Sequence, residues 1–390
     1  MSNNLKIPFG TKDFLPLEAG EKRIIENKLA QLFLKWGYNE VVTPTLEYLD
    51  TLTIGSRLDE SLIYKFTAKE NKTLALRHEM TTPIARLVAS RLKESPLPLK
   101  LSYISNVYRC GDIQKGKQCE FYQAGAELIG ENNAASDAEV VALAVEGILA
   151  AGVKNFKLSL GEVEFVKGLF EQYNISKDLT EKLQNAMERH DLVSYENIAD
   201  SLEISNEGKT ALKEIPYLKG NVEVLKKAYN IAVNSKSRRA LDRLSEMQEL
   251  LTAYGVSEYI AFDLGILRDM SYYTGMIFEA YTAGLGFPLC GGGRYDRLLS
   301  DFGRPLPATG FAIGIERILL AKEKECKLES KNSKIVYISY SEGKIKDAIL
   351  KAKTLREDDK CVFLALKAER QEDAETYKNR MGYGELIYIA

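Results

Sequence analysis

Apolar residues recur at helical spacing near the start of the chain. After Pro16 they fall three or four positions apart, a period that predicts an amphipathic helix; they are Ile24, Ile25, Leu29, Leu32, Phe33 and Trp36. Gly37 follows at the position where a left-handed residue commonly ends a helix. The pattern therefore predicts one helix between Pro16 and Gly37.

Alternating apolar and polar positions predict strands after this helix. Glu40–Thr43 runs into Pro44, which cannot donate inside a sheet, so we expect an edge strand or a strand end there. Two longer alternating segments, Leu101–Cys110 and Gln118–Ile129, flank a glycine-containing stretch with lysines. They predict an antiparallel pair joined by a flexible, basic-tipped loop.

Helical patterns dominate the middle of the chain. Ser136 is placed to cap a helix that runs from Asp137 to Ala151. From about residue 164 to residue 254 the chain is rich in Lys, Glu, Leu and Asn, with helical periodicity and few β-branched runs. This stretch predicts a helical insertion that interrupts a sheet.

The sheet is expected to resume after the insertion. Apolar segments near Ile260 and at Met276–Tyr281 predict strands, and Gly291–Gly293 is interpreted as a turn. A last helix is expected to begin around Ile315, and the polar residues 323–333 have the character of a linker. Beyond the linker, apolar and helical segments alternate as β-α-β-α-β over about 58 residues, which is small for an α/β domain.

Composition narrows the functional classes. The 390 residues are 45% hydrophobic and 28% charged with a net charge of −2, so the chain as a whole lacks the basic surplus typical of nucleic-acid binders. Its five cysteines form no C-x-x-C pair, which indicates free thiols in a reducing compartment. Two histidines, neither at ligand spacing to a cysteine, argue against a structural zinc site and weaken any Ser-His or Cys-His nucleophile hypothesis. No apolar signal core and no run of about 18 apolar residues occurs, so we expect a soluble cytoplasmic protein.

Four polar clusters stand out as candidate chemistry: residues 76–81, residues 108–127, residues 268–275, and residues 289–296 with 310–317. Each has an ordinary structural explanation. Gln123 and Glu127 are four positions apart on a predicted strand and share a face, but such a face is often solvent. The triple glycine is not a Walker phosphate loop, because no Gly-Lys-Ser/Thr follows it.

The combination of these clusters resembles the histidyl-tRNA synthetases, which are class II aminoacyl-tRNA synthetases. The resemblance rests on Arg109 between two strands, the run Arg268-x-x-x-Tyr272-Tyr273-Thr-Gly, the run Cys-Gly-Gly-Gly-Arg294-Tyr295-Asp, and the run Gly-Phe-Ala-Ile-Gly-Ile-Glu-Arg317. It covers about residues 5–322. It implies an α+β fold in which an antiparallel sheet is flanked by helices, and dimer formation through the segment around Pro44.

The resemblance also implies a set of histidine-binding residues. Glu79 and Thr81 match positions near the amino acid's ammonium group, and Arg268 matches the arginine that faces the carboxylate. The implied set, completed by residues around the imidazole, is Glu79, Thr81, Gln123, Glu127, Arg268, Tyr272, Tyr273 and Tyr295. These residue types suit a zwitterion with an imidazole, which needs acidic acceptors, a guanidinium and aromatic walls. At His78 the synthetases usually have proline.

The residues that hold ATP in the synthetases are only partly present. Arg109 is followed by Cys110 and Gly111, where the synthetases place a glutamate two residues after the arginine. Cys119 stands where they have a second arginine. Transfer of an adenylyl group depends on cations placed on developing charge, so these differences predict a disabled ATP site. Arg109 and Arg317 persist as a residual anion-binding site.

The tail differs from a synthetase anticodon-binding domain, which is larger. Residues 333–390 contain 11 Lys and Arg against 10 Asp and Glu, so no basic face for RNA is expected. We predict two domains, a synthetase-like core at 1–322 with its insertion at about 164–254, and a shortened anticodon-binding-like α/β domain at 333–390.

A kept histidine site, a disabled ATP site and a short tail resemble one known family, the regulatory subunits of ATP phosphoribosyltransferase. That resemblance implies a non-catalytic subunit that assembles with the short-form catalytic subunit, senses histidine for feedback inhibition of histidine biosynthesis and self-associates as a dimer. It implies no cofactor, no metal, no membrane and no tRNA partner. The alternatives are a divergent histidyl-tRNA synthetase, a histidine-activating ligase, and a paralogue that controls translation through RNA.

Overall fold

The predicted strand pair forms the centre of the fold. In the computed structural model, which describes residues 5–54, 60–69, 72–110, 118–266, 272–325 and 334–390, β5 (Leu99–Tyr108) and β6 (Glu120–Ile129) pair antiparallel over their full lengths. Both segments alternate between apolar and polar residues, so one face of each strand can be buried. This confirms the antiparallel pair; the loop expected between the strands, residues 111–117, lies outside the described residues.

A nine-stranded sheet is built around this pair in the described chain, in the order β1-β5-β6-β12-β11-β10-β7-β9-β8. Its pairs from β5 to β7 are antiparallel, and β1–β5 and β7–β9 are parallel. The remaining strands are β1 (Asn39–Glu40), β7 (Lys157–Glu162), β8 (Lys219–Gly220), β9 (Ile260–Asp263), β10 (Met276–Tyr281), β11 (Cys290–Arg294) and β12 (Ala308–Gly314). The predicted α+β class with a mainly antiparallel sheet is confirmed. The strand expected at Glu40–Thr43 is shorter, although Val41 still donates to the Ser102 carbonyl.

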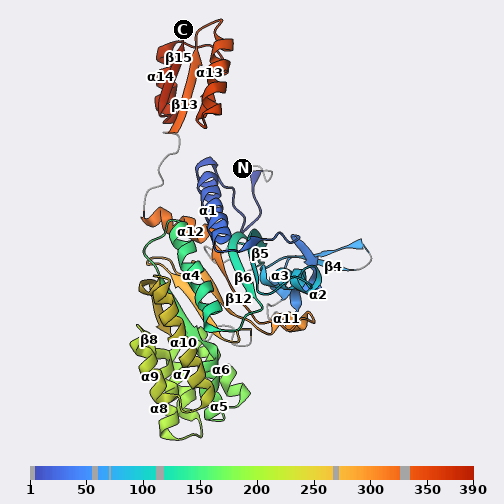
Figure 1. Ribbon diagram of the computed structural model, residues 1–390, viewed down its shortest axis with the longest axis vertical. Helices are drawn as coiled ribbons and strands as arrows, with labels where there is room; N and C mark the ends of the chain where they lie inside the picture. The colour runs from blue at the N-terminus through green and yellow to red at the C-terminus, as the bar shows by residue number, and fades with distance from the viewer. Residues whose placement is uncertain (1–4, 55–59, 70–71, 111–117, 267–271, 326–333) are drawn as a thin grey trace. The chain divides into compact units, whose positions relative to one another are not determined.

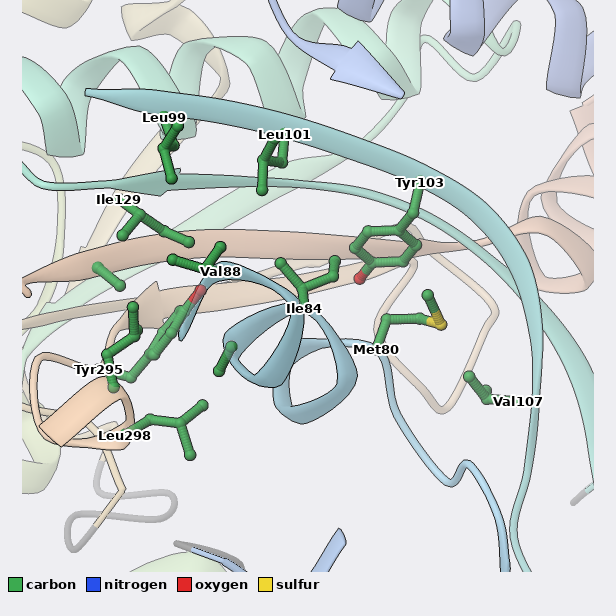
Figure 2. Close-up of a cluster of buried hydrophobic side chains, with 13 residues drawn as sticks. Met80, Ile84, Val88, Leu99, Leu101, Tyr103, Val107, Ile129, Tyr295 and Leu298 are labelled. Atoms are coloured by element: carbon green, nitrogen blue, oxygen red, sulfur yellow. The ribbon is translucent and has the colours of Figure 1, made fainter. Parts of the chain in front are cut away.

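Helices cover both faces of the sheet (Figure 1). On one face lie α1 (Pro16–Lys35), where Phe33 packs edge-on against Phe311, and α4 (Ala134–Ala150). On the other lie α3 (Thr81–Ser90) and α11 (Leu298–Asp301), which close over the buried cluster drawn in Figure 2. A last helix, α12 (Ile315–Glu325), begins where the sequence predicts. A small sheet, β2 (Leu46–Tyr48), β4 (Thr73–Leu76) and β3 (Lys65–Thr67), accompanies α2 (Leu49–Thr53).

Two sequence expectations are wrong. The helix expected from Asp137 with Ser136 as its cap begins at Ala134. Asn133 is the N-cap because its side chain accepts from the Ser136 amide at 2.8 Å, while the Ser136 hydroxyl lies 3.4 Å from the Asn133 amide. The second is the glycine turn at Gly291–Gly293, which is part of strand β11. A Cβ on residue 292 would lie 2.4 Å from the Gly310 carbonyl oxygen, so crowding between strands, rather than a turn, requires glycine there.

The stretch after β7 is helical, as its composition indicates. It contains α5 (Val163–Gln172), α6 (Lys177–Glu188), α7 (Leu192–Ser201), α8 (Asn206–Glu214), α9 (Glu223–Ile231) and α10 (Ser235–Ala253). One short strand, β8, interrupts these helices and pairs with β9. Within the larger compact unit, which runs from residue 21 to residue 325 and includes residues 5–13, α10 packs along α4 and α5.

The smaller unit contains residues 14–20 and 334–390 of the described chain, and its sheet lies in residues 334–390. It has the predicted β-α-β-α-β order, with β13 (Ile335–Tyr340) between the parallel neighbours β14 (Cys361–Leu364) and β15 (Glu385–Ile389). The connecting helices are α13 (Ile345–Glu357) and α14 (Gln371–Met381). None of the helices in the described residues of either unit is long and apolar enough to cross a membrane.

Candidate functional site

The candidate site lies on the face of the sheet that α3 and α11 cover. Glu127, Gly310 and Gly293 are cross-strand neighbours on β6, β12 and β11, and directly opposed residues of an antiparallel pair share a face. A Cβ on residue 310 would lie 1.7 Å from the Glu127 Oε2, and one on residue 293 would lie 2.7 Å from the Tyr273 ring. The two glycines therefore let a carboxylate and an aromatic ring lie directly on the sheet.

Glu127 is the centre of this site. Its side chain is 2% exposed; Oε1 accepts from the Thr81 hydroxyl at 3.1 Å, and Oε2 accepts from the Tyr295 hydroxyl. Burial raises the pKa of Glu127 to about 8, although the two hydroxyl donors act in the opposite direction. In the ligand-free protein the carboxyl group is therefore mostly protonated at neutral pH.

Glu79 joins the same network from the start of α3. Its carboxylate accepts from the main-chain nitrogens of Thr81 at 2.5 Å and Thr82 at 3.0 Å. Those amides have no partner inside the helix, and an acidic group at a helix N-terminus is favoured by the helix dipole. Glu79 thus fixes the first turn of α3 and, with it, the Thr81 hydroxyl that reaches Glu127.

Tyrosines form the aromatic wall of the site. The rings of Tyr272 and Tyr295 are stacked with centroids 5.6 Å apart, and Tyr273 meets Tyr272 edge-on at 5.0 Å. Burial raises the pKa of Tyr272 and of Tyr295, so both hydroxyls stay protonated. The structure brings together six of the residues that the resemblance implies around this point: Glu79, Thr81, Glu127, Tyr272, Tyr273 and Tyr295.

Gln123 and Arg268 are not part of the contacts around Glu127 that the structure describes. Gln123 is on the same face of β6 but two pleats away, opposite Ser105 and Gly314, at about 13 Å along the strand. Arg268 lies outside the described residues. Its role in facing a carboxylate stays a prediction.

The two arginines expected to bind an anion are each held by a main-chain carbonyl. Arg109 donates from Nε to the His78 oxygen at 3.0 Å, with its guanidinium 5.4 Å from the Phe121 ring centroid. Arg317 donates from Nη1 to the Pro288 oxygen at 2.6 Å and lies over Phe287 at 5.4 Å. Whether either guanidinium also binds an anion stays a prediction.

The resemblance to the synthetases implies that Cys119 stands where they have a second arginine, and Cys110 comes directly before Gly111, where they have a glutamate. Cys119 is buried, and its amide donates to the Gly10 oxygen at 2.7 Å. The neighbouring thiol of Cys119, together with burial and the thiol of Cys110, raises the pKa of the Tyr64 hydroxyl. Both cysteines are free thiols. Neither residue supplies the positive charge of an arginine or the negative charge of a glutamate.

Sequence reasoning missed Tyr103. Its side chain is 2% exposed, and it lies across the strands from Gly125 on the same face as Glu127. The alternation along Leu101–Cys110 places it on this face, but the same alternation fits an ordinary core tyrosine. Among the described residues, no group of three or more His, Cys, Asp or Glu side chains is arranged to hold a metal ion.

Comparison with known proteins places these features in a family. The sequence profile of the family described as histidyl-tRNA synthetase matches residues 10–318. An ATP phosphoribosyltransferase regulatory subunit from Moorella thermoacetica is 44% identical over 325 residues, which are 83% of this chain and 84% of that protein. The chain belongs to the family of ATP phosphoribosyltransferase regulatory subunits.

Solved structures agree with this assignment. A protein from Bacillus halodurans described as an ATP phosphoribosyltransferase regulatory subunit/histidyl-tRNA synthetase matches with a TM-score of 0.88 and 36% identity, over 99% of this chain and 98% of that one. Histidyl-tRNA synthetase from Nostoc sp. PCC 7120 gives a TM-score of 0.86 at 20% identity, over 99% of this chain and 92% of that one, which shows the shared fold. The predicted family and fold class are thus confirmed.

Proposed function

We propose that this chain is the non-catalytic regulatory subunit of an ATP phosphoribosyltransferase, and that it binds histidine to report the level of the pathway's end product. The observation that carries the proposal is the Glu127 network. A carboxyl group 2% exposed, held by two hydroxyl donors and walled by tyrosines, is suited to an imidazole N–H. Membership of the family of ATP phosphoribosyltransferase regulatory subunits indicates that the enzyme under regulation is an ATP phosphoribosyltransferase.

The state of the ATP side supports a subunit without ligase activity. The buried thiol of Cys119 packs against Gly10, so closely that a Cβ on residue 10 would lie 2.4 Å from its Sγ. A thiol gives no electrostatic stabilisation to a transferring adenylyl group, whereas a guanidinium does. The competing proposal is a histidine-activating ligase. Cys119 does not give such a ligase the positive charge that a guanidinium would supply at this position.

We propose that the partner is the short-form catalytic subunit and that the chain also forms a dimer through the segment around Pro44. Three large apolar side chains flank that proline and are exposed: Val42 by 81%, Leu46 by 47% and Tyr48 by 49%. Exposed apolar side chains gathered on one segment are typical of an interface.

The side chain of Arg77 connects this segment to the residues beside the proposed histidine site. Buried Arg77 donates from Nη1 to the Thr43 oxygen at 2.8 Å and from Nε to the Asn106 oxygen at 2.8 Å. Glu79 and Thr81, whose side chains take part in the network around Glu127, come two and four positions after Arg77 in the chain. A displacement of residues 77–81 on ligand binding is therefore transmitted to the Pro44 segment.

The remaining parts of the proposal concern the tail and the compartment. The smaller unit is proposed to be a shortened anticodon-binding-like domain that does not bind tRNA, because its 11 basic residues are balanced by 10 acidic ones. The free thiols of Cys110, Cys119, Cys290 and Cys361 fit a reducing compartment such as the cytoplasm.

The test measures catalytic-subunit activity with and without this chain, over a range of histidine concentrations. Glu127→Gln replaces one carboxyl oxygen with an NH2 donor, so the site loses an acceptor for the imidazole N–H. The variant should weaken histidine inhibition at least about fivefold, because a buried polar group left without its partner costs about 1–3 kcal/mol. Glu162→Gln is the matched control, because Glu162 is equally buried but sits at the end of β7. Activity that is independent of this chain, or inhibition that survives Glu127→Gln unchanged, would overturn the proposal. Histidine-dependent exchange of pyrophosphate into ATP would favour the ligase instead.

A further inference from the structure

Tyr103 is placed in the site by a glycine on the neighbouring strand. Tyr103 on β5 and Gly125 on β6 are directly opposed, and a Cβ on residue 125 would lie 2.4 Å from the Tyr103 hydroxyl oxygen. Only glycine at 125 lets the tyrosine ring lie flat across β6. Its hydroxyl is thereby directed across the sheet, instead of away from it.

The Tyr103 hydroxyl has no hydrogen-bond partner in the described part of the chain. Among the described residues, the fully buried side-chain nitrogen and oxygen atoms that lack a hydrogen-bond partner belong to Glu26, Thr43, His78 and Glu162. The hydroxyl of Tyr103 is not one of them, so it keeps contact with open space although the residue is only 2% exposed. A buried tyrosine hydroxyl usually finds a partner, so this one is available to a ligand.

The surroundings of Tyr103 are those of the proposed histidine site. Glu127, Glu79, Cys290 and Tyr273 are close enough to raise its pKa further, after the larger effect of burial. The hydroxyl therefore remains a neutral donor. Figure 2 shows that the rings of Tyr103 and Tyr295 both lie in the layer between the sheet and α3. Tyr103 enters this layer from β5, and Tyr295 lies at the opposite end of the cluster.

We propose that Tyr103 is a further ligand-binding residue, and that its hydroxyl donates a hydrogen bond to the acceptor nitrogen of the bound imidazole. A neutral imidazole carries one N–H donor and one acceptor nitrogen. Glu127, positioned by Thr81 and Tyr295, takes the N–H, and Tyr103 satisfies the other nitrogen. This inference rests on the proposed function, because it assigns a second contact within the same histidine site.

The experiment uses Tyr103→Phe in the full chain and calorimetric titration with two ligands. One ligand is histidine; the other is the alanine derivative that carries pyrrole in place of imidazole, which keeps an N–H and lacks the acceptor nitrogen. Loss of one buried hydrogen bond should lower histidine affinity about five- to twentyfold, and leave affinity for the pyrrole analogue unchanged. Tyr195→Phe is the matched control, because its buried hydroxyl donates to the Leu212 oxygen within the helical insertion.

The outcomes separate this inference from the proposed function. Wild-type affinity for histidine in Tyr103→Phe would overturn the inference while the proposed function stands. An equal loss for both ligands would also overturn it, because the ring would then act through packing alone. A wild-type chain that binds no histidine would overturn the proposed function and this inference together. Unchanged thermal unfolding of Tyr103→Phe confirms that the measured loss comes from the contact.

Discussion

The carboxyl group of Glu162 should make the free energy of unfolding of this protein depend on pH. Glu162 ends β7 with 2% of its surface exposed, and its Oε1 accepts from the Glu164 amide at 3.2 Å. Its Oε2 is sealed without a partner among the described residues. Burial, reinforced by the nearby carboxylate of Asp137, raises the pKa of Glu162 to about 8, although Arg243 acts in the opposite direction.

The sign and size of the effect follow from linkage. In the unfolded chain the carboxyl group has its ordinary pKa of 4.5, so between that value and 8 the folded state holds a proton that the unfolded state has released. The stability that Glu162 contributes is complete below pH 4.5 and is lost as the pH rises through 8. For these two pKa values the loss between pH 5 and pH 8 is about 3 kcal/mol in the free energy of unfolding.

The assay is urea unfolding of the wild type and of Glu162→Gln at pH values from 5 to 8. The amide of glutamine does not titrate, so the stability difference between the two proteins isolates the proton on Glu162. We expect the variant to gain about 3 kcal/mol relative to the wild type across this range. Glu40→Gln, at an exposed position, is the control and should show no such trend. A difference between wild type and Glu162→Gln that is the same at pH 5 and pH 8 would refute the argument.

Two further substitutions test the packing beneath the site. Arg294, 1% exposed, donates to Asp137 Oδ1 at 2.6 Å and 2.9 Å, so Arg294→Met should cost about 3–5 kcal/mol in urea unfolding, with partial recovery on adding Asp137→Asn; an unaltered midpoint would contradict this. Gly310→Ala should displace the Glu127 carboxyl and lower histidine affinity at least tenfold by calorimetry, because its Cβ would overlap Oε2, whereas Gly286→Ala, with nothing within 4 Å, should bind normally. Equal affinities for the two alanine variants would show that the close approach of Gly310 to Glu127 does not matter for binding.

Local patterns were sufficient to predict most of the elements. The alternation along Leu101–Cys110 and Gln118–Ile129 predicts β5 and β6 to within a few residues, because each strand buries one face only. Helix caps were less certain, since Asn133 and Ser136 are both good N-caps and the structure uses them together. The sequence could not decide which residue begins the helix, because either choice leaves the same apolar face buried.

The glycines show where sequence reasoning fails. Three glycines in a row favour a turn, and the structure has a strand there, because the reason for glycine lies on other strands. Gly292 must avoid the Gly310 carbonyl, and Gly293 must leave room for the Tyr273 ring. Neither neighbour is close in the sequence. The resemblance to the synthetases supplied the site residues that such reasoning could not, and Tyr103 was missed because neither route distinguishes it from a core residue.

Gly310 also explains how the Glu127 carboxyl group can be buried although no described cation lies beside it. Gly310 admits the Glu127 side chain to a position where burial favours the protonated form, and the hydroxyls of Thr81 and Tyr295 stabilise whichever form is present. The two hydrogen bonds of Glu127, from Thr81 and Tyr295, are therefore present without a ligand. Cys119 is held by different contacts: it packs against Gly10, and its main-chain nitrogen donates to the Gly10 oxygen. The contacts that hold Glu127 and those that hold Cys119 share no residue, so we expect a substitution at Cys119 to leave the hydrogen bonds of Glu127 in place.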